Sequence, residues 1–351
     1  MTRVTILWAH WSGYMDACAQ ALVEEQGCEV TIGYLLPEGN APFSQKDFFQ
    51  YSCTAVPADA QLEPLPSAIL ESAPDILLVC GWHLPAYRRF SAAHKGRGVR
   101  VLCMDNQWHG TARQWLGVLS APFFLRPAYD AALVPGARQA AFARRLGFPA
   151  ARIREGHYAC DYAPFSARHA ARQSRPLTRN FLFAGRLVPQ KGVDVLMEAW
   201  RRFTEQGHAH WNLTIVGGGT LPDGMTLPPR VRMTGFVQPS ALPDTFLQGD
   251  IFVLPSNWEP WGLVIHEAAA TGMPLICSQP CGAADAYLRD GVNGYLIPRN
   301  DPSSLLSAFE KFSRMNEEGL RQMGQASFDL AAKRTPSTWA STVIATLRDM
   351  K

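Results

Sequence analysis

The sequence has 351 residues, of which 47% are hydrophobic and 18% are charged, and its formal net charge is +3. This composition is typical of a globular chain, and the length favours two domains over one. No apolar stretch approaches the roughly 20 residues of a membrane-spanning helix, and the first residues lack the pattern of a signal peptide. These features exclude a membrane-spanning protein and lead us to expect a cytoplasmic one.

The first half of the chain alternates apolar, β-branched runs with segments of helical pattern. The predicted strands are residues 4–9, 28–35, 75–80, 99–104 and 129–134. The predicted helices are residues 14–26, 65–72, 85–94, 111–118 and 136–146. Strands that alternate with helices predict a parallel sheet covered on both faces, with ligands at the carboxyl ends of its strands.

Polar and small residues follow several of these strands. Gly13 lies in the turn after the first one, where a glycine allows a tight turn. Asp105 and His109 follow the strand at residues 99–104. For each of these two side chains, a direct role in a binding site and a structural hydrogen bond both remain open.

Charge is distributed unevenly over the first half. Residues 1–85 hold two basic and ten acidic side chains, whereas residues 86–154 hold twelve basic and two acidic ones. Aromatic and aliphatic residues lie between positions 115 and 125 of this basic segment. Basic plus apolar composition is typical of a surface that lies on a membrane, here the inner face of one. The alternative is a solvated helix face with the aromatic residues in the core. No nucleic-acid-binding motif is present, so no nucleic acid partner is expected.

Residues 166–179 are rich in Ala, Arg and Ser, and the sequence predicts that they form a linker. On this interpretation residues 1–165 form a first domain and residues 180–334 form a second one. Residues 335–351 then form a last helix. Its apolar stripe consists of Trp339, Val343 and Leu347.

The second half begins with a predicted strand at residues 180–184. Gly-Arg-Leu-Val-Pro-Gln-Lys-Gly follows from Gly185, and a helix is predicted at residues 193–204. The turn presents the cations Arg186 and Lys191 on a glycine-rich backbone, an arrangement that suits a diphosphate. A surface turn with ordinary charges is the alternative.

Two further strands end in small or aromatic residues. Residues 213–216 lead into Gly217, Gly218 and a third glycine, and residues 231–236 lead through Gly235. The three glycines are not a dinucleotide-binding fingerprint, because a proline stands where the last glycine of that fingerprint is needed and no helix follows.

Residues 251–254 predict a buried strand, followed by a loop and then by a helix with Pro260 and Trp261 in its first turn. The helix is expected to end before Gly272, and residues 275–277 predict the next strand.

Two glutamates distinguish this helix. Glu259 lies at its start, where the first backbone amides have no partner within the helix and favour an anion. Glu267 lies eight residues further, about 12 Å along the axis. The two carboxylates are too far apart to act as one acid pair. Their separation suits the two ends of an elongated ligand such as a nucleotide diphosphate sugar.

Glu259 and Glu267, with seven residues between them, resemble the E-x7-E signature of retaining glycosyltransferase family 4. The run from Gly185 through Arg186 and Lys191 is similar to the G-R-x4-K-G motif of the same family. The resemblance implies the α/β fold called GT-B, which has two Rossmann-like domains, a deep cleft between them and a C-terminal helix that crosses back to the first domain.

The resemblance also implies roles for these residues. Arg186 and Lys191 would neutralise the departing nucleotide diphosphate, Glu259 would meet the hydroxyls of the donor sugar, and Glu267 would meet the ribose. Asp105 and His109 are the candidates for a contact with the reacting sugar. The other implied donor contacts are Gly13, Gly185, Gly217, Gly218, Gly235, Phe236, Val237, Pro260, Trp261, Gly262, Leu263 and Val264.

The function implied is that of a retaining, metal-independent glycosyltransferase of polysaccharide biosynthesis that needs no cofactor. Its donor is expected to be a UDP-sugar first and a GDP-sugar second, and its acceptor a glycan, a lipid-linked molecule or a small molecule bound mainly by the first domain. Two alternatives stay open: a nucleotide-sugar epimerase of GT-B fold, and a non-catalytic subunit that binds a nucleotide sugar.

Overall fold

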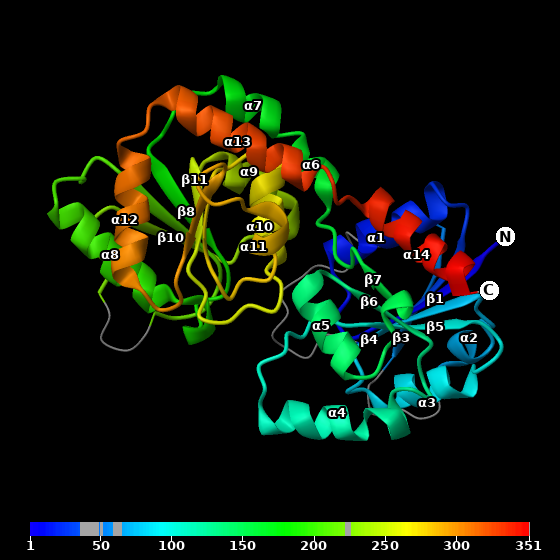
Figure 1. Cartoon of the computed structure of the whole chain (residues 1–351). Helices are drawn as coiled ribbons and strands as arrows, with labels where there is room; N and C mark the ends of the chain where they lie inside the picture. Colours follow the sequence, from blue (N-terminus) through cyan, green and yellow to red (C-terminus); the bar gives the residue numbers. More distant parts are fainter. Residues whose placement is uncertain (36–48, 50–51, 59–64, 222–225, 351) are drawn as a thin grey trace. The chain divides into compact units, whose positions relative to one another are not determined.

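The computed structural model describes residues 1–35, 49, 52–58, 65–221 and 226–350 (Figure 1). The chain divides into two compact units: unit 1 comprises residues 1–161 and 334–351, and unit 2 comprises residues 162–333. In the part of the chain that is described, no helix is both long and apolar enough to cross a bilayer.

Within its described residues, unit 1 contains a seven-stranded parallel sheet in the order β3-β2-β1-β4-β5-β6-β7. The strands are β1 (Arg3–Trp8), β2 (Glu29–Leu35), β3 (Thr54–Ala58), β4 (Ile76–Cys80), β5 (Val99–Cys103), β6 (Ala131–Val134) and β7 (Ile153–Glu155). Val4 pairs with Val30 on one side and with Ile76 on the other. Apolar side chains are buried on both faces of this sheet, which explains why its central strands are nearly continuous apolar runs in the sequence.

Helices cover both faces of the sheet. The helices of unit 1 are α1 (Gly13–Glu24), α2 (Ser67–Leu70), α3 (Pro85–Ala93), α4 (Ala112–Phe124), α5 (Ala137–Arg145), the short 3-10 helix η2 (Ala150–Arg152) and α14 (Pro336–Met350). Side chains of α1 and α14 belong to the core on one face, and those of α2, α3 and α5 belong to the core on the other. The last helix therefore returns to the first unit as the sequence predicted, with Trp339, Val343 and Leu347 buried.

A buried hydrogen bond also fixes α14. The indole Nε1 of Trp339 donates to Nδ1 of His157, 3.3 Å away. Burial lowers the pKa of His157 to about 3, so its ring is neutral at pH 7 and Nδ1 can accept this bond. Further along the helix, Arg154 and Asp349 form an ion pair of 2.7 Å.

Strand β3 and helix α4 of unit 1 differ from the sequence prediction. Strand β3 was not predicted, because it is short and contains Pro57. It lies at the edge of the sheet, where a missing backbone N–H is tolerated. Helix α4 was expected to end at residue 118 but continues to Phe124 through Pro122, which lies in its last turn.

Unit 2 contains, among its described residues, a six-stranded parallel sheet in the order β10-β9-β8-β11-β12-β13. The strands are β8 (Asn180–Ala184), β9 (Asn212–Val216), β10 (Val231–Gly235), β11 (Ile251–Leu254), β12 (Leu275–Ser278) and β13 (Gly294–Ile297). The helices are α6 (Tyr162–Ser166), α7 (His169–Ser174), α8 (Val193–Glu205), α9 (Leu242–Leu247), α10 (Leu263–Ala270), α11 (Ala284–Tyr287), α12 (Pro302–Ser313) and α13 (Glu317–Ala331), with 3-10 helices η3 (Pro189–Lys191) and η4 (Pro239–Ala241). This parallel arrangement follows from the alternation of strands and helices in the sequence.

The segment predicted as a linker, residues 166–179, is instead part of unit 2 and contains α7. Its Arg172 is buried and donates to the backbone oxygens of Phe246, Gly249 and Thr271 at 2.6, 2.6 and 2.9 Å. The arginine-rich composition is therefore a means of fixing the segment to the unit, because a guanidinium can satisfy several buried carbonyls at once.

Candidate functional site

Arg186 and Lys191 lie in the turn between β8 and α8. Asn257, in the loop after β11, holds this turn by two hydrogen bonds: its backbone amide donates to the oxygen of Gln190 at 2.8 Å, and its side-chain amide donates to the oxygen of Pro189 at 3.0 Å. The loop after β11 also carries Glu259. Residues that are far apart in the sequence are thus brought to one end of the sheet by paired loops.

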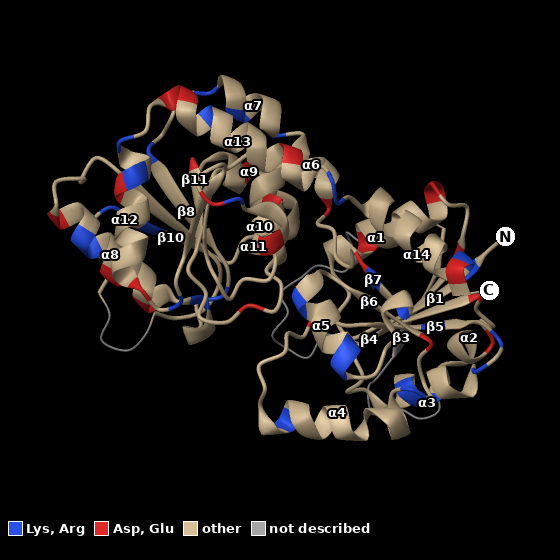
Figure 2. Cartoon of the chain, in the orientation of Figure 1, with Lys and Arg blue, Asp and Glu red and all other residues tan. Residues whose placement is uncertain are grey.

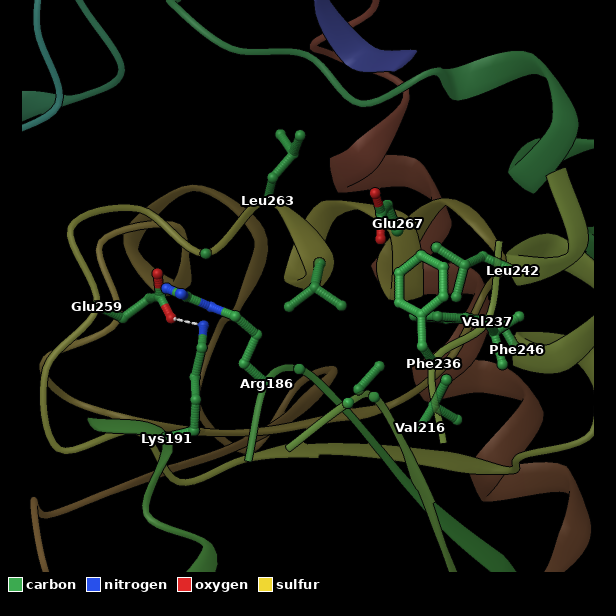
Figure 3. A pocket seen from close by; sticks show the side chains of 16 residues that line it. Arg186, Lys191, Val216, Phe236, Val237, Leu242, Phe246, Glu259, Leu263 and Glu267 are labelled. Atoms are coloured by element: carbon green, nitrogen blue, oxygen red, sulfur yellow. Dashed lines mark hydrogen bonds and ion pairs between the residues drawn. The ribbon is translucent and has the colours of Figure 1, made fainter. Parts of the chain in front are cut away.

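Lys191 and Glu259 form an ion pair in which the ammonium Nζ donates to the carboxylate Oε2 (Figure 3). Their side chains are only 16% and 12% exposed. Figure 3 shows Arg186 reaching toward the same carboxylate from the neighbouring strand end. The carboxylate of Glu259 thus has one cation bonded to it and another close by, and this arrangement favours an anionic ligand with polar hydroxyl groups.

Glycines bring the backbone close to this point. Gly262 precedes α10 with φ = 90°, and a Cβ atom there would lie 2.9 Å from Cγ of Glu259. Gly217 has φ = 142°, and a Cβ atom there would lie 1.9 Å from the oxygen of Gly185. Only glycine fits at these two positions without a shift of the neighbouring atoms. Because Gly262 has no side chain, none at this position covers the first backbone amides of α10. These amides carry the positive end of the helix dipole beside Glu259.

A pocket of about 290 Å³ lies between these elements. Its lining residues are Ala184, Gly185, Arg186, Lys191, Val216, Gly217, Gly218, Phe236, Val237, Leu242, Phe246, Glu259, Gly262, Leu263, Val264 and Glu267. The pocket has a charged end at Lys191 and an apolar end at Phe236 (Figure 3). In Figure 3, Glu267, on the second turn of α10, and Phe236 both lie toward the end of the pocket away from Lys191. A ligand that fills the pocket meets cations and helix amides first, and then a carboxylate and an aromatic ring.

Most of the residues that the sequence analysis assigned to donor binding line this pocket. Three of them in unit 2 do not: Gly235, Pro260 and Trp261. Pro260 and Trp261 were expected in the first turn of α10, but the helix begins at Leu263. Trp261 is buried, and its backbone oxygen accepts from the amide of Ala283 at 2.8 Å. Trp261 therefore has a structural role, in that it fixes the loop before α10.

Gly13, Asp105 and His109 belong to unit 1 and are not among the lining residues of this pocket. Gly13 is the first residue of α1, and Asp105 and His109 lie in the loop after β5. The half-buried carboxylate of Asp105 accepts from the hydroxyl of Tyr158 at 3.4 Å, whereas the side chain of His109 is exposed. The carboxyl ends of β1 and β5 thus carry these residues at one edge of the sheet.

Four lining residues escaped the sequence analysis: Ala184, Val216, Leu242 and Phe246. Ala184 and Val216 are the last residues of β8 and β9, and strand ends were already the expected place for a ligand. Leu242 and Phe246 lie one turn apart on α9, so they face the same way. Their apolar character gave no chemical signal in the sequence.

Cys281 lies next to the charged end, since it pairs with Glu259 in an isolated parallel bridge. Burial raises the pKa of its thiol to about 11, and the carboxylate of Glu259 also acts in this direction. The thiol therefore stays protonated at pH 7 and is not a nucleophile. Among the described residues, no group of three or more His, Cys, Asp and Glu side chains is placed to hold a metal ion.

Comparison with known proteins finds a family match within unit 2. Residues 168–329 match the model of glycosyl transferases group 1. Glycogen synthase of Mycobacterium tuberculosis is 34% identical over 146 residues, which are 40% of this chain and 35% of the synthase. The uncharacterized glycosyltransferase MJ1607 of Methanocaldococcus jannaschii is 32% identical over 131 residues, which are 35% of this chain and 33% of that protein. The matches thus span about a third of the length of these curated relatives.

The fold has a counterpart that covers both units. The crystal structure of Alr3699/HepE of Anabaena in complex with UDP-glucose aligns with a TM-score of 0.73 and 16% identity, covering 99% of this chain and 100% of that one. Residues 168–329 thus match the model of glycosyl transferases group 1, in a chain whose two parallel-sheet units have the GT-B fold.

Proposed function

We propose that the chain is a glycosyltransferase that binds a nucleotide diphosphate sugar in the pocket of unit 2 and transfers the sugar to an acceptor. The observation that carries this proposal is the ion pair of Lys191 and Glu259 beside the tip of α10. A cation and helix amides suit the diphosphate, and a carboxylate next to them suits the hydroxyl groups of a sugar.

The far end of the pocket supports the nucleoside part of this assignment. Glu267 presents a carboxylate that can accept hydrogen bonds from the two hydroxyls of a ribose. Phe236 and Leu242 offer an apolar surface to a base. The order of charged end, carboxylate and aromatic ring matches the order of diphosphate, ribose and base in such a donor.

The proposed reaction is driven by electrostatic stabilisation. When the bond between the anomeric carbon and the diphosphate oxygen breaks, the electron pair stays on the diphosphate. Arg186, Lys191 and the amides of α10 stabilise this charge in place. The acceptor oxygen bonds to the anomeric carbon from the same face, and its proton passes to the departing phosphate oxygen. The configuration is then retained, and no metal takes part.

A UDP-sugar is the first donor that we propose, and a GDP-sugar is the second. UDP-glucose is the ligand named for the Anabaena protein of the same fold. The proposed acceptor is a glycan, a lipid-linked molecule or a small molecule. Asp105 and His109 are the groups proposed to contact the acceptor or the reacting sugar, because they follow a strand of unit 1 at its carboxyl end.

A thermal-shift screen of the purified chain against UDP, GDP, ADP, dTDP and their common sugars tests the donor assignment. A ligand that binds the folded chain raises its Tm, and we expect one diphosphate to stand out. Uridine, which lacks the diphosphate, should give a much smaller shift than UDP. Arg186→Ala should reduce the shift, while Arg314→Ala, just after α12 and outside the pocket lining, should leave it unchanged. The absence of a shift with every nucleotide, or equal shifts in both variants, contradicts the assignment.

A further inference from the structure

Helix α4 of unit 1 carries a stripe of large apolar side chains on its outer face. Trp115, Leu116, Leu119 and Phe123 are 54%, 67%, 69% and 82% exposed. With 3.6 residues per turn, these positions fall within one face about 100° wide. Val118 and Ala121, on another side of the helix, pack against the core of the unit. The helix is therefore held to the unit on one side and presents an apolar face on another.

This clustering separates α4 from the rest of the surface. Ten large hydrophobic side chains are exposed among the described residues, and four of them lie on this helix. Single exposed hydrophobic residues are normal on a protein, whereas a contiguous group marks a site of interaction. None of these four residues lines the donor pocket, so the proposed transfer reaction gives no reason for their exposure.

Arginines surround the stripe. Arg113 and Arg126 are exposed on the helix and just after its end. The guanidinium of Arg88, on α3, lies 5.3 Å from the ring centroid of Phe124. That of Arg145, on α5, lies 5.0 Å from the ring centroid of Trp108, which packs edge-on against Trp115. Figure 2 shows basic (blue) segments on α3, α4 and α5.

The sequence segment that contains α4 adds no acidic side chain. The sequence holds no Asp or Glu between positions 106 and 129. Asp130 is occupied by an ion pair of 2.7 Å with the buried Arg100. The described charged side chains named at the border of the apolar stripe are therefore positive. A partner that covers it must be apolar at its centre and negative at its edge.

We propose that α4 docks on the surface of an anionic lipid bilayer. Trp115, Leu116, Leu119 and Phe123 enter the boundary between headgroups and acyl chains, and the arginines bind lipid phosphates. A second copy of the chain fits this face less well, since docking the same face of two copies brings arginines together and like charges oppose association. The proposal does not depend on the donor pocket or on the transfer reaction.

Co-sedimentation with lipid vesicles tests the proposal on the full chain. The vesicles contain either phosphatidylglycerol mixed with phosphatidylcholine or phosphatidylcholine alone. We expect the wild type to sediment with the anionic vesicles. Leu119→Glu/Phe123→Glu should lower the partition coefficient at least about tenfold, because both side chains would carry charge into the boundary region. Arg113→Gln and Arg126→Gln should each lower it about fivefold.

Val292→Glu is the matched control, because Val292 is 59% exposed and lies in unit 2. It should bind vesicles like the wild type, and circular dichroism should show that every variant is folded. Four results overturn the proposal: a wild type that stays in the supernatant, unchanged binding by the double glutamate variant, equal binding to vesicles of phosphatidylcholine alone, or a wild-type dimer that the double glutamate variant converts to a monomer.

Discussion

Lys191 donates to Glu259 across 68 residues of sequence, and this ion pair joins the turn after β8 to the tip of α10. In the proposed complex, the ammonium of Lys191 binds the diphosphate instead, and the carboxylate of Glu259 can then accept hydrogen bonds from the sugar. The pair thus holds two groups in place before the donor arrives, so that less ordering is needed when it binds.

Replacing Lys191 with Ala should weaken the binding of the donor nucleotide. A charged hydrogen bond to the diphosphate is lost, so we expect a loss of at least ~1.5 kcal/mol, or about tenfold in Kd. Isothermal titration with the diphosphate that emerges from the thermal-shift screen measures this loss. Lys311→Ala is the control, since Lys311 lies over the ring of Tyr295. If the Lys191 variant and the wild type bind the nucleotide with equal affinity, Lys191 does not bind the diphosphate.

Gly262→Ala should reduce transfer more than it reduces stability. The new methyl group meets Cγ of Glu259 at 2.9 Å, so the carboxylate must move. Gly207→Ala is a close control, because Gly207 has φ = 94° and its added Cβ meets nothing within 4 Å. Both variants carry the backbone cost of a left-handed alanine, about 1 kcal/mol. Tm should therefore fall by similar amounts, while only Gly262→Ala loses activity. Similar activities of the two variants would contradict the role of this glycine.

Arg172→Met should destabilise unit 2 by about 3 kcal/mol, because it removes the donor of three buried hydrogen bonds and leaves backbone oxygens without their partner. Urea unfolding followed by circular dichroism measures the change. Arg168→Met, on the same segment, breaks only an exposed pair with Asp244 and should leave stability nearly unchanged. A small effect at Arg172 would mean that the predicted linker is not essential to the fold of the unit.

His157 should make unit 1 less stable in acid. Its pKa is about 3 in the folded chain, below the ordinary value of 6.5, because burial disfavours the charged ring. Between these two values the unfolded chain binds the extra proton and the folded chain does not, so stability falls as the pH is lowered through this window. The slope contributed by this one group is up to about 1.4 kcal/mol per pH unit.

His157→Asn tests this directly, because asparagine keeps an acceptor for the indole of Trp339 and does not titrate. Chemical unfolding at several values between pH 7 and pH 4 should show a shallower dependence for the variant than for the wild type. Parallel curves would show that the protonation of His157 does not contribute to acid unfolding.

The predicted two-sheet fold is confirmed, because apolar strands that alternate with helices are visible in the sequence itself. Glycines and charges also pointed to residues that the structure brings together at the charged end of the pocket, and the roles of these residues stay predictions. The predicted start of α10 was wrong. Nothing in the sequence Glu-Pro-Trp-Gly reveals that Gly262 adopts a left-handed conformation and that the helix begins after it.

The linker prediction failed for a different reason. Arg172 bonds to backbone oxygens that lie 74 to 99 residues away, and such partners cannot be inferred from local composition. Leu242 and Phe246 were missed in the pocket because an apolar residue looks the same in a core and in a binding site. The roles of Asp105, His109 and Gly13 stay predictions, as do the retaining mechanism and the identity of the donor.

The most direct test of the central claim is the transfer of radiolabel from a panel of UDP-sugars and GDP-sugars to mono- and oligosaccharide acceptors, with the wild type and with Glu259→Gln. We expect the wild type to form a labelled glycoside and the variant to be at least about 100-fold slower, because its sugar is no longer held for attack. The affinity for the nucleotide should change little, and Glu310→Gln, on α12, should act like the wild type. Full turnover by Glu259→Gln, or a wild type that only converts one nucleotide sugar into another, would contradict the account.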